Sequence, residues 1–74
     1  MTLQDLKVGQ KGRVLKVGTV GALKQRFNAM GLTKGVDVEI MKIAPLGDPI
    51  EIIVRGYNLS IRKNDAQNIE VEVL

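Results

Sequence analysis

The feature that most constrains the fold of this chain is a series of short apolar stretches with a period of two. In residues 36–40, valine or isoleucine alternates with an acidic residue, as on a β-strand with one buried face. The same pattern returns in residues 50–54, 57–61 and 69–73, and a first strand is expected at about residues 13–17. About five strands this short indicate a mostly β domain.

Turn signals separate these stretches. The strongest is the segment 44–49, in which two prolines bracket Gly-Asp. The alternation slips at Ile40 and Met41, which predicts a β-bulge of the kind that lets a short sheet curl. Gly56 is expected to kink or bulge one continuous hairpin arm.

One amphipathic helix is expected from about Val20 to Met30. Its apolar residues recur at spacings of three and four and so share one face: Val20, Leu23, Phe27 and Met30. The opposite face carries Lys24, Gln25, Arg26 and Asn28. Gly31 is the expected left-handed stop, with Leu32 folding back on the last turn as in a Schellman motif.

Two short helical turns are also predicted. Thr2, with Asp5 three residues later, resembles a capping box at an opening turn. Residues 64–67 support one further turn, with Asn64 as its cap.

Residues 1–74 are expected to form a single domain, because a chain of this length supports only one small core. The chain contains no cysteine, so no disulfide can supplement that core. Five strands and one helix in so few residues favour a small barrel, since curling the sheet covers strand edges that a flat sheet leaves exposed.

The longest aliphatic run, residues 52–54, falls far short of the roughly 20 residues that span a bilayer. The N-terminus also lacks the apolar segment of a signal peptide. We therefore expect a cytoplasmic protein that meets a membrane only through a partner.

The chemistry for catalysis is missing. Histidine and cysteine are absent, and most acidic residues fall on outward strand positions or in turns. Glu70 and Glu72 share a strand face, which we interpret as a charged exterior and not as a metal site. The loop 18–21 precedes a helix but lacks the motifs of nucleotide-binding loops. We expect neither an enzyme nor a cofactor.

The formal net charge is +3, from 11 Lys and Arg against 8 Asp and Glu. We interpret the basic residues as alternating with acidic ones along most of the chain, which predicts a mixed, solvated surface. A small basic nucleic-acid-binding barrel is the alternative hypothesis. It is disfavoured because base stacking requires aromatic side chains, and the chain has only Phe27 and Tyr57.

Several segments resemble the FeoA family, small proteins associated with bacterial ferrous iron uptake. They are LKQRFNAMGL (23–32), GVDV (35–38), APLGDPI (44–50) and RGYNLSIR (55–62), together with LQDLKVG (3–9) and DAQNI (65–69). Phe27 and Met30 depart from the family's usual leucines, which changes core volume more than surface chemistry.

The resemblance implies an SH3-like barrel and an accessory role beside the FeoB ferrous iron transporter, a membrane protein with a cytosolic GTP-binding domain. Contact with the cytosolic part of that partner is expected to use outward residues near the helix and the turns: Lys24, Arg26, Leu46, Asp48 and Arg55. For Asp48, a hydrogen bond to its own turn backbone is the preferred interpretation. Self-association of the chain into a homo-oligomer is left open.

Overall fold

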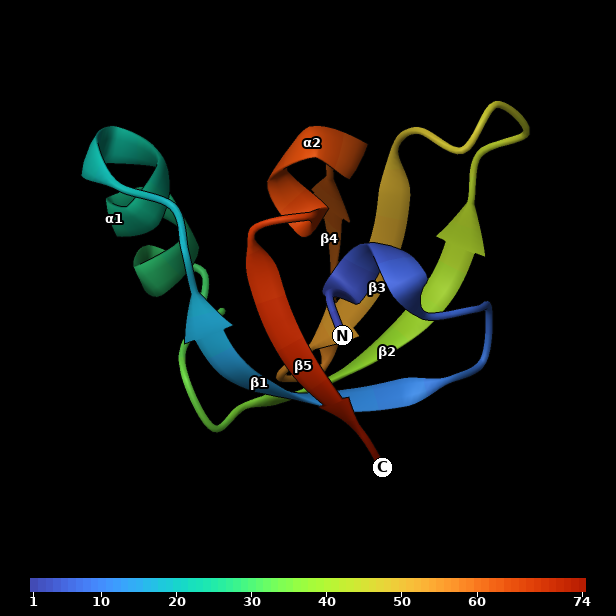
Figure 1. Ribbon diagram of the computed structural model, residues 1–74, viewed down its shortest axis with the longest axis horizontal. Coiled ribbons are helices and arrows are strands. Elements are labelled where there is room, and N and C mark those ends of the chain that lie inside the picture. Colours follow the sequence, from blue (N-terminus) through green and yellow to red (C-terminus); the bar gives the residue numbers. More distant parts are fainter.

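The computed structural model describes all residues, 1–74, as five antiparallel strands with three short helical segments (Figure 1). The strands run in the spatial order β4-β3-β2-β1-β5, and the sheet curls into a small barrel with extents of 29 × 24 × 23 Å. The strands are β1 (Lys11–Val17), β2 (Asp37–Ile43), β3 (Ile50–Val54), β4 (Tyr57–Ile61) and β5 (Ile69–Val73). The helices are η1 (Leu3–Asp5, a 3₁₀ turn), α1 (Gly21–Ala29) and α2 (Lys63–Ala66).

The predicted alternation sets the inner face of the sheet. In β3 the side chains of Ile50, Ile52 and Val54 are buried, whereas Glu51 and Ile53 are half-buried. The same parity holds on the other strands, so the inner faces meet in one hydrophobic core. Its 15 residues are Leu3, Leu6, Val14, Phe27, Leu32, Val38, Ile40, Ile50, Ile52, Val54, Leu59, Ile61, Ala66, Ile69 and Val71.

Two irregularities bend the sheet. The register of β2 against β3 shifts between Ile40 and Lys42, which confirms the predicted bulge at Met41. A second shift, between Val14 and Lys16 in β1, was not predicted. The residues at the two shifts, Met41 and Leu15, are 44% and 42% exposed. Each bulge thus turns an apolar side chain outward and increases the local twist that curls the sheet.

The prediction that Gly56 interrupts one continuous arm is wrong. β3 and β4 are separate strands joined by a two-residue hairpin turn at Arg55 and Gly56. Their φ angles are 50° and 88°, so both central residues are left-handed, as in the type I′ turn that matches the twist of a hairpin. Arg55 is the only residue other than glycine with a positive φ.

Helix α1 ends as predicted. Gly31 has a φ of 85°, its N–H donates to the carbonyl of Asn28 (3.1 Å), and the N–H of Leu32 donates to the carbonyl of Phe27 (2.9 Å). This pair of bonds is the Schellman motif. The start differs from the prediction, because Val20 is the N-cap residue and is 81% exposed. Val20 lies before the helical turn and therefore does not continue its apolar face.

Helix α2 begins one residue earlier than predicted. Its N-cap residue is Arg62, and the proposed cap Asn64 lies inside the helix. The first N–H of the helix, that of Lys63, donates instead to Oδ1 of Asp48 at 3.0 Å. The acceptor comes from the loop between β2 and β3, so the prediction that Asp48 bonds its own turn backbone is wrong.

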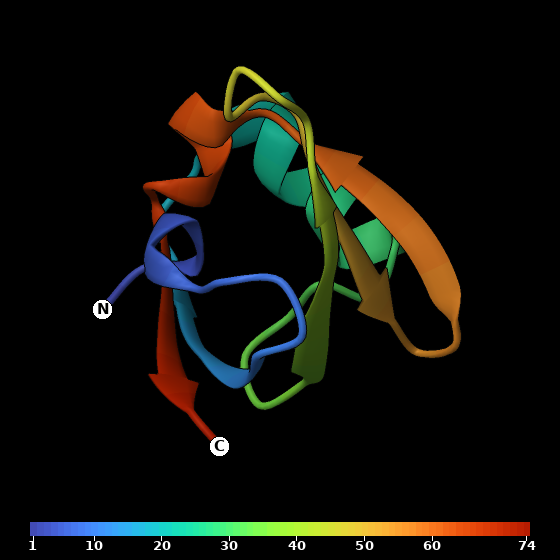
Figure 2. The same ribbon diagram turned by 90° about the vertical axis from the view of Figure 1, so that its right-hand side faces the viewer.

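The N-terminal segment lies against β5 (Figure 2). Thr2 forms an isolated antiparallel bridge with Glu70, and the N–H of Val71 donates to the carbonyl of Met1 at 2.9 Å. The predicted capping interaction is present, since the N–H of Thr2 donates to Oδ2 of Asp5 at 2.9 Å. The segment therefore covers the outer edge of β5, which is not hydrogen-bonded to β4.

Candidate partner-binding surface

The five residues predicted to meet a partner do not form one site. Lys24 and Arg26 are both exposed on α1, but two residues correspond to about 200° of helical rotation. Lys24 faces a cleft beside β1, whereas Arg26 faces a smaller one beside β4 and α2. Lys24 and Arg26 therefore face different sides of the molecule and do not belong to one contact surface.

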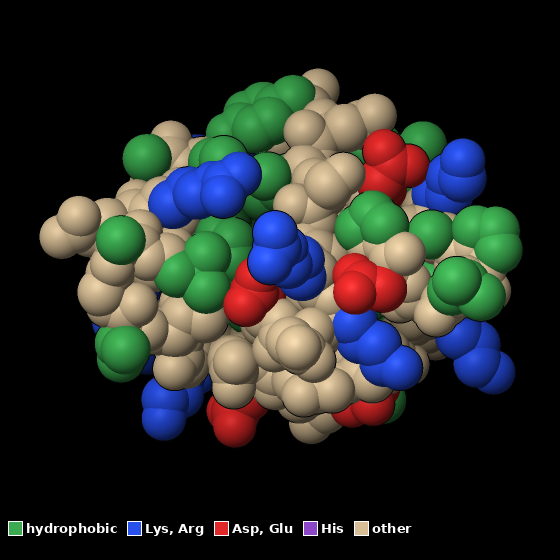
Figure 3. Space-filling view, turned by 90° about the horizontal axis from the view of Figure 1, so that it is seen from above, with side chains coloured by type: hydrophobic (Ala, Val, Ile, Leu, Met, Phe, Trp, Pro, Cys, Tyr) green, Lys and Arg blue, Asp and Glu red, His purple; other side chains and the backbone are tan.

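Leu46 lies at the tip of the loop between β2 and β3 (residues 44–49) and is 94% exposed. On the end of the molecule that carries this loop together with α1 and α2, hydrophobic groups gather where the loop projects (Figure 3). Further hydrophobic groups lie on the opposite side of this face, with basic and acidic side chains between them. Leu46 is thus an exposed apolar contact point at the tip of the loop.

Arg55 is fixed at the hairpin turn and points back toward the end of α1. Its Nε donates to the carbonyl of Gly31 at 3.4 Å, and the hydroxyl of neighbouring Tyr57 donates to the carbonyl of Met30. Both carbonyls belong to the C-terminal end of α1, where acceptors are left without helical partners. Arg55 and Tyr57 therefore attach the helix to the sheet, and Arg55 lines neither the cleft of Lys24 nor that of Arg26.

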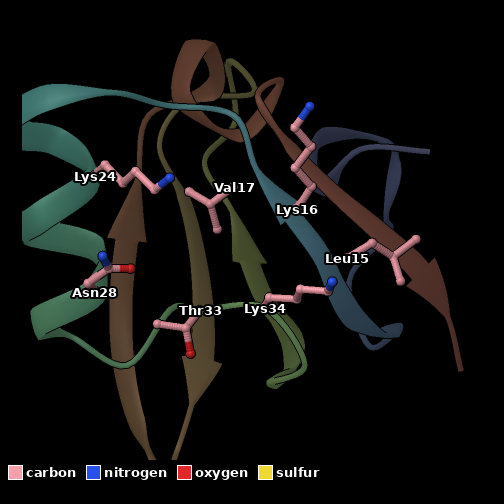
Figure 4. A pocket seen from close by; sticks show the side chains of 7 residues that line it. All are labelled: Leu15, Lys16, Val17, Lys24, Asn28, Thr33 and Lys34. Carbon is pink, nitrogen blue, oxygen red and sulfur yellow. The ribbon is translucent and has the colours of Figure 1, made fainter.

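The largest hollow of the molecule lies between α1 and β1 and has a volume of about 430 Å³ (Figure 4). The sequence did not predict that its lining residues lie together. Lys24 and Asn28 extend from one side of α1, since they are one helical turn apart. We call this hollow the basic cleft, lined by Leu15, Lys16, Val17, Lys24, Asn28, Thr33 and Lys34.

The basic cleft has three ammonium groups and no carboxylate among its lining residues. Lys16 lies opposite Glu70 in the β1–β5 register, but the two charged groups do not come within 4 Å. The one ion pair of the molecule joins Arg13 and Asp37 elsewhere. The cleft is therefore a region of unbalanced positive charge on a chain whose net charge is only +3.

The sequence carries a signal for this cleft. Residues 6–36 contain seven Lys or Arg and no Asp or Glu, whereas the other residues contain four Lys or Arg and all eight Asp or Glu. The predicted alternation of charges is therefore wrong for the first half of the chain. Because β1, α1 and the loop after α1 all come from this stretch, the cleft that they enclose has no acidic side chain.

The Arg13–Asp37 pair spans β1 and β2 with Nε and Oδ1 at 2.9 Å. The hydrogen bond to Asp37, and then the charge of that carboxylate, raises the pKa of Arg13 above its ordinary value. Glu72, opposite Arg13 on β5, adds to the same effect. Glu70 and Glu72 thus each lie opposite a basic residue of β1, in agreement with a charged exterior face.

The structure contains no group of three or more His, Cys, Asp or Glu side chains that could hold a metal ion. None of its helices is long and apolar enough to cross a membrane. The lining of the basic cleft consists of three cations, an amide and a hydroxyl beside two aliphatic side chains.

Known proteins are similar to this chain in sequence and in fold. A sequence model described as the FeoA domain matches residues 1–73. A protein of Porphyromonas gingivalis named as a fusion of Fe(2+) transport protein A and the Fe(2+) transporter FeoB is 34% identical over all 74 residues. This chain covers only 9% of the length of that fusion protein.

Solved structures agree. The iron(II) transport protein A of Clostridium thermocellum is 38% identical, with a TM-score of 0.95 over 100% of this chain and 46% of that one. The FeoA of Stenotrophomonas maltophilia, a prokaryotic SH3 domain protein solved with zinc, is 25% identical. Its TM-score is 0.84, over 97% of this chain and 89% of that one. The SH3-like fold is therefore confirmed, and the chain belongs to the FeoA domain family.

Proposed function

We propose that this chain is an accessory protein of ferrous iron uptake that acts by contact with the cytosolic part of a FeoB-type membrane transporter. The observation that carries the proposal is the fusion relative, in which a segment matching all 74 residues is part of one polypeptide with the transporter. Domains fused in one protein often act together as separate chains in another, because the linker only raises their local concentration.

The surface of the domain suits binding rather than chemistry. It offers an open cleft with three lysines, an exposed Leu46 and no group of three or more His, Cys, Asp or Glu side chains. Of the predicted contact residues, Lys24 and Leu46 are free to meet a partner. Asp48 and Arg55 form hydrogen bonds within the fold, to the N–H of Lys63 and the carbonyl of Gly31 respectively. Arg26 lies on a different side of α1 from Lys24.

A titration tests the proposal. Uniformly ¹⁵N-labelled protein is mixed with the purified cytosolic part of the FeoB-type transporter encoded in the same genome, and amide chemical shifts are followed. Saturable shifts at micromolar to millimolar concentration are expected, and a globular acidic protein of similar charge serves as the control. Unchanged spectra up to about 1 mM, the range of weak affinities near −4 kcal/mol, would contradict it.

A further inference from the structure

The three lysines of the basic cleft have no partner within the molecule. Lys16, Lys24 and Lys34 are exposed, take part in no ion pair and donate no side-chain hydrogen bond. They come from three elements, namely β1, α1 and the loop after α1. The fold thus brings three like charges around one hollow, and their mutual repulsion is relieved by an anionic occupant.

The neutral lining residues narrow the chemistry of that occupant. The side chains of Asn28 and Thr33 are also without hydrogen bonds in the fold, so they can donate to carboxylate or carbonyl oxygens. Leu15, turned outward by its bulge, and half-buried Val17 add aliphatic surface beside the charges. An occupant that fits has negative charges, hydrogen-bond acceptors and at least one apolar group.

A nucleic acid fits these observations less well. Base stacking requires an aromatic surface, and neither aromatic residue lines the cleft. Phe27 is buried in the core, and the hydroxyl of Tyr57 is bonded at the end of α1. The aliphatic wall also offers nothing to a sugar-phosphate backbone. An acidic protein segment supplies carboxylates, main-chain carbonyls and apolar side chains at once.

We propose that the basic cleft binds an acidic segment of a partner protein, with carboxylates against Lys16, Lys24 and Lys34 and an apolar side chain against Leu15 and Val17. The identity of the partner as a FeoB-type transporter rests on the function proposed above. The chemistry of the cleft does not, because it follows from the lining residues alone. The inference therefore has its own test.

The test uses two triple variants with the same net charge. In the cleft variant, Lys16→Gln, Lys24→Gln and Lys34→Gln remove the three ammonium groups and leave polar, unbranched side chains of similar helix propensity. In the control variant, Lys7→Gln, Lys42→Gln and Lys63→Gln remove three exposed charges outside the cleft. Both variants lower the formal charge from +3 to 0, so nonspecific attraction falls equally.

Three probes are titrated into the labelled proteins. They are the cytosolic part of the transporter, a peptide of about eight residues made of Glu with two Leu, and a single-stranded oligonucleotide. The peptide reaches roughly 27 Å when extended, close to the 29 Å length of the molecule. The expected result is peptide binding with shifts centred on the cleft residues of β1, α1 and the following loop. The Kd should rise at least about ten-fold in the cleft variant, but only about two-fold in the control.

The remaining outcomes separate the two proposals. Peptide binding at the cleft without transporter binding supports the inference and contradicts the proposed function. Peptide binding that both triple variants weaken equally, or peptide shifts centred on Leu46 or Arg26, overturns the inference and leaves the function intact. Tighter binding of the oligonucleotide than of the peptide at equal salt also overturns it, as does a peptide that leaves the spectra unchanged.

Discussion

The backbone N–H of Lys63 donates to Oδ1 of Asp48 at 3.0 Å, which joins the first turn of α2 to the loop between β2 and β3. The N-cap residue Arg62 provides no side-chain acceptor, and the helix has only four residues. An acceptor at the start of a helix satisfies an N–H that has no partner within the helix. Asp48 therefore acts as a cap from 15 residues away in the sequence.

Replacing Asp48 with Ala is expected to destabilise the fold by about 1 kcal/mol, the usual effect of losing a capping side chain. Asp48→Asn keeps an oxygen acceptor and should retain more than half of this stability. Urea unfolding followed by circular dichroism measures both. An Asn variant as unstable as the Ala variant would show that the carboxylate charge, and not the hydrogen bond, is what matters.

Gly31→Ala is expected to destabilise the protein by about 1–2 kcal/mol, because φ at this position is +85° and an L side chain is strained there. A Cβ would also lie 2.7 Å from Cδ of Arg55 and displace that side chain from the end of α1. Gly56→Ala is the matched control, with a φ of +88° and open space around its Cβ. The melting temperature of Gly31→Ala should be lower than that of Gly56→Ala. The reverse order would contradict the expected clash of the added Cβ with Arg55.

Arg55→Asn is expected to stabilise the protein by about 0.5–1 kcal/mol, since Asn followed by Gly is a preferred pair for a two-residue type I′ turn. Arg55 itself adopts a φ of 50°, which is uncommon for a long side chain. The gain is reduced by loss of the contact with Gly31. Arg55→Val, which is β-branched, should destabilise. Equal unfolding midpoints for the two variants would argue against a left-handed turn here.

Ile52→Ala is expected to cost about 2–5 kcal/mol, which is enough to unfold much of a small domain. Ile52 is completely buried at the centre of β3. Its neighbour Ile53 points to the other face and is half-buried, so Ile53→Ala should cost less than half as much. Denaturant midpoints of the two variants, which differ by one residue in position, test the inward parity of the strand directly.

The stabilisation that the Arg13–Asp37 pair gives to the fold should not change between about pH 7 and 10. Asp37 raises the pKa of Arg13, so the stabilisation is complete below the ordinary arginine pKa and is lost only when the pH rises through the raised value. The difference in melting temperature between the wild type and Arg13→Gln should therefore stay constant from about pH 7 to 10. A difference that shrinks over this interval would contradict the assignment.

The sequence was sufficient for features that depend on local patterns. Period-two alternation located the strands, and the slip at Met41 located one bulge. The Gly31–Leu32 pair identified the end of α1, because a Schellman motif depends on a glycine and the apolar residue directly after it. The hairpin at Arg55 and Gly56 was missed because a left-handed arginine gives no turn signal of its own.

Features that depend on distant contacts could not be found in this way. The cap of α2 comes from Asp48 in the loop between β2 and β3, whereas the residues next to the helix favour Asn64. The basic cleft unites Lys16, Lys24 and Lys34, whose proximity appears only once β1 and α1 are folded together. The acid-free stretch 6–36 does predict an excess of positive charge, but not the hollow that collects it.

The hydrogen bond from the N–H of Val71 to the carbonyl of Met1 holds residues 1 and 71 side by side. Leu74 is three residues beyond Val71, so the Cα atoms of these two residues are at most roughly 11 Å apart along an extended chain. A short glycine linker can therefore join the ends, and the chain can be reopened at the exposed tip beside Leu46. Such a circular permutant would begin with β3 and end with β2, with every inward-facing side chain of the barrel in its original place.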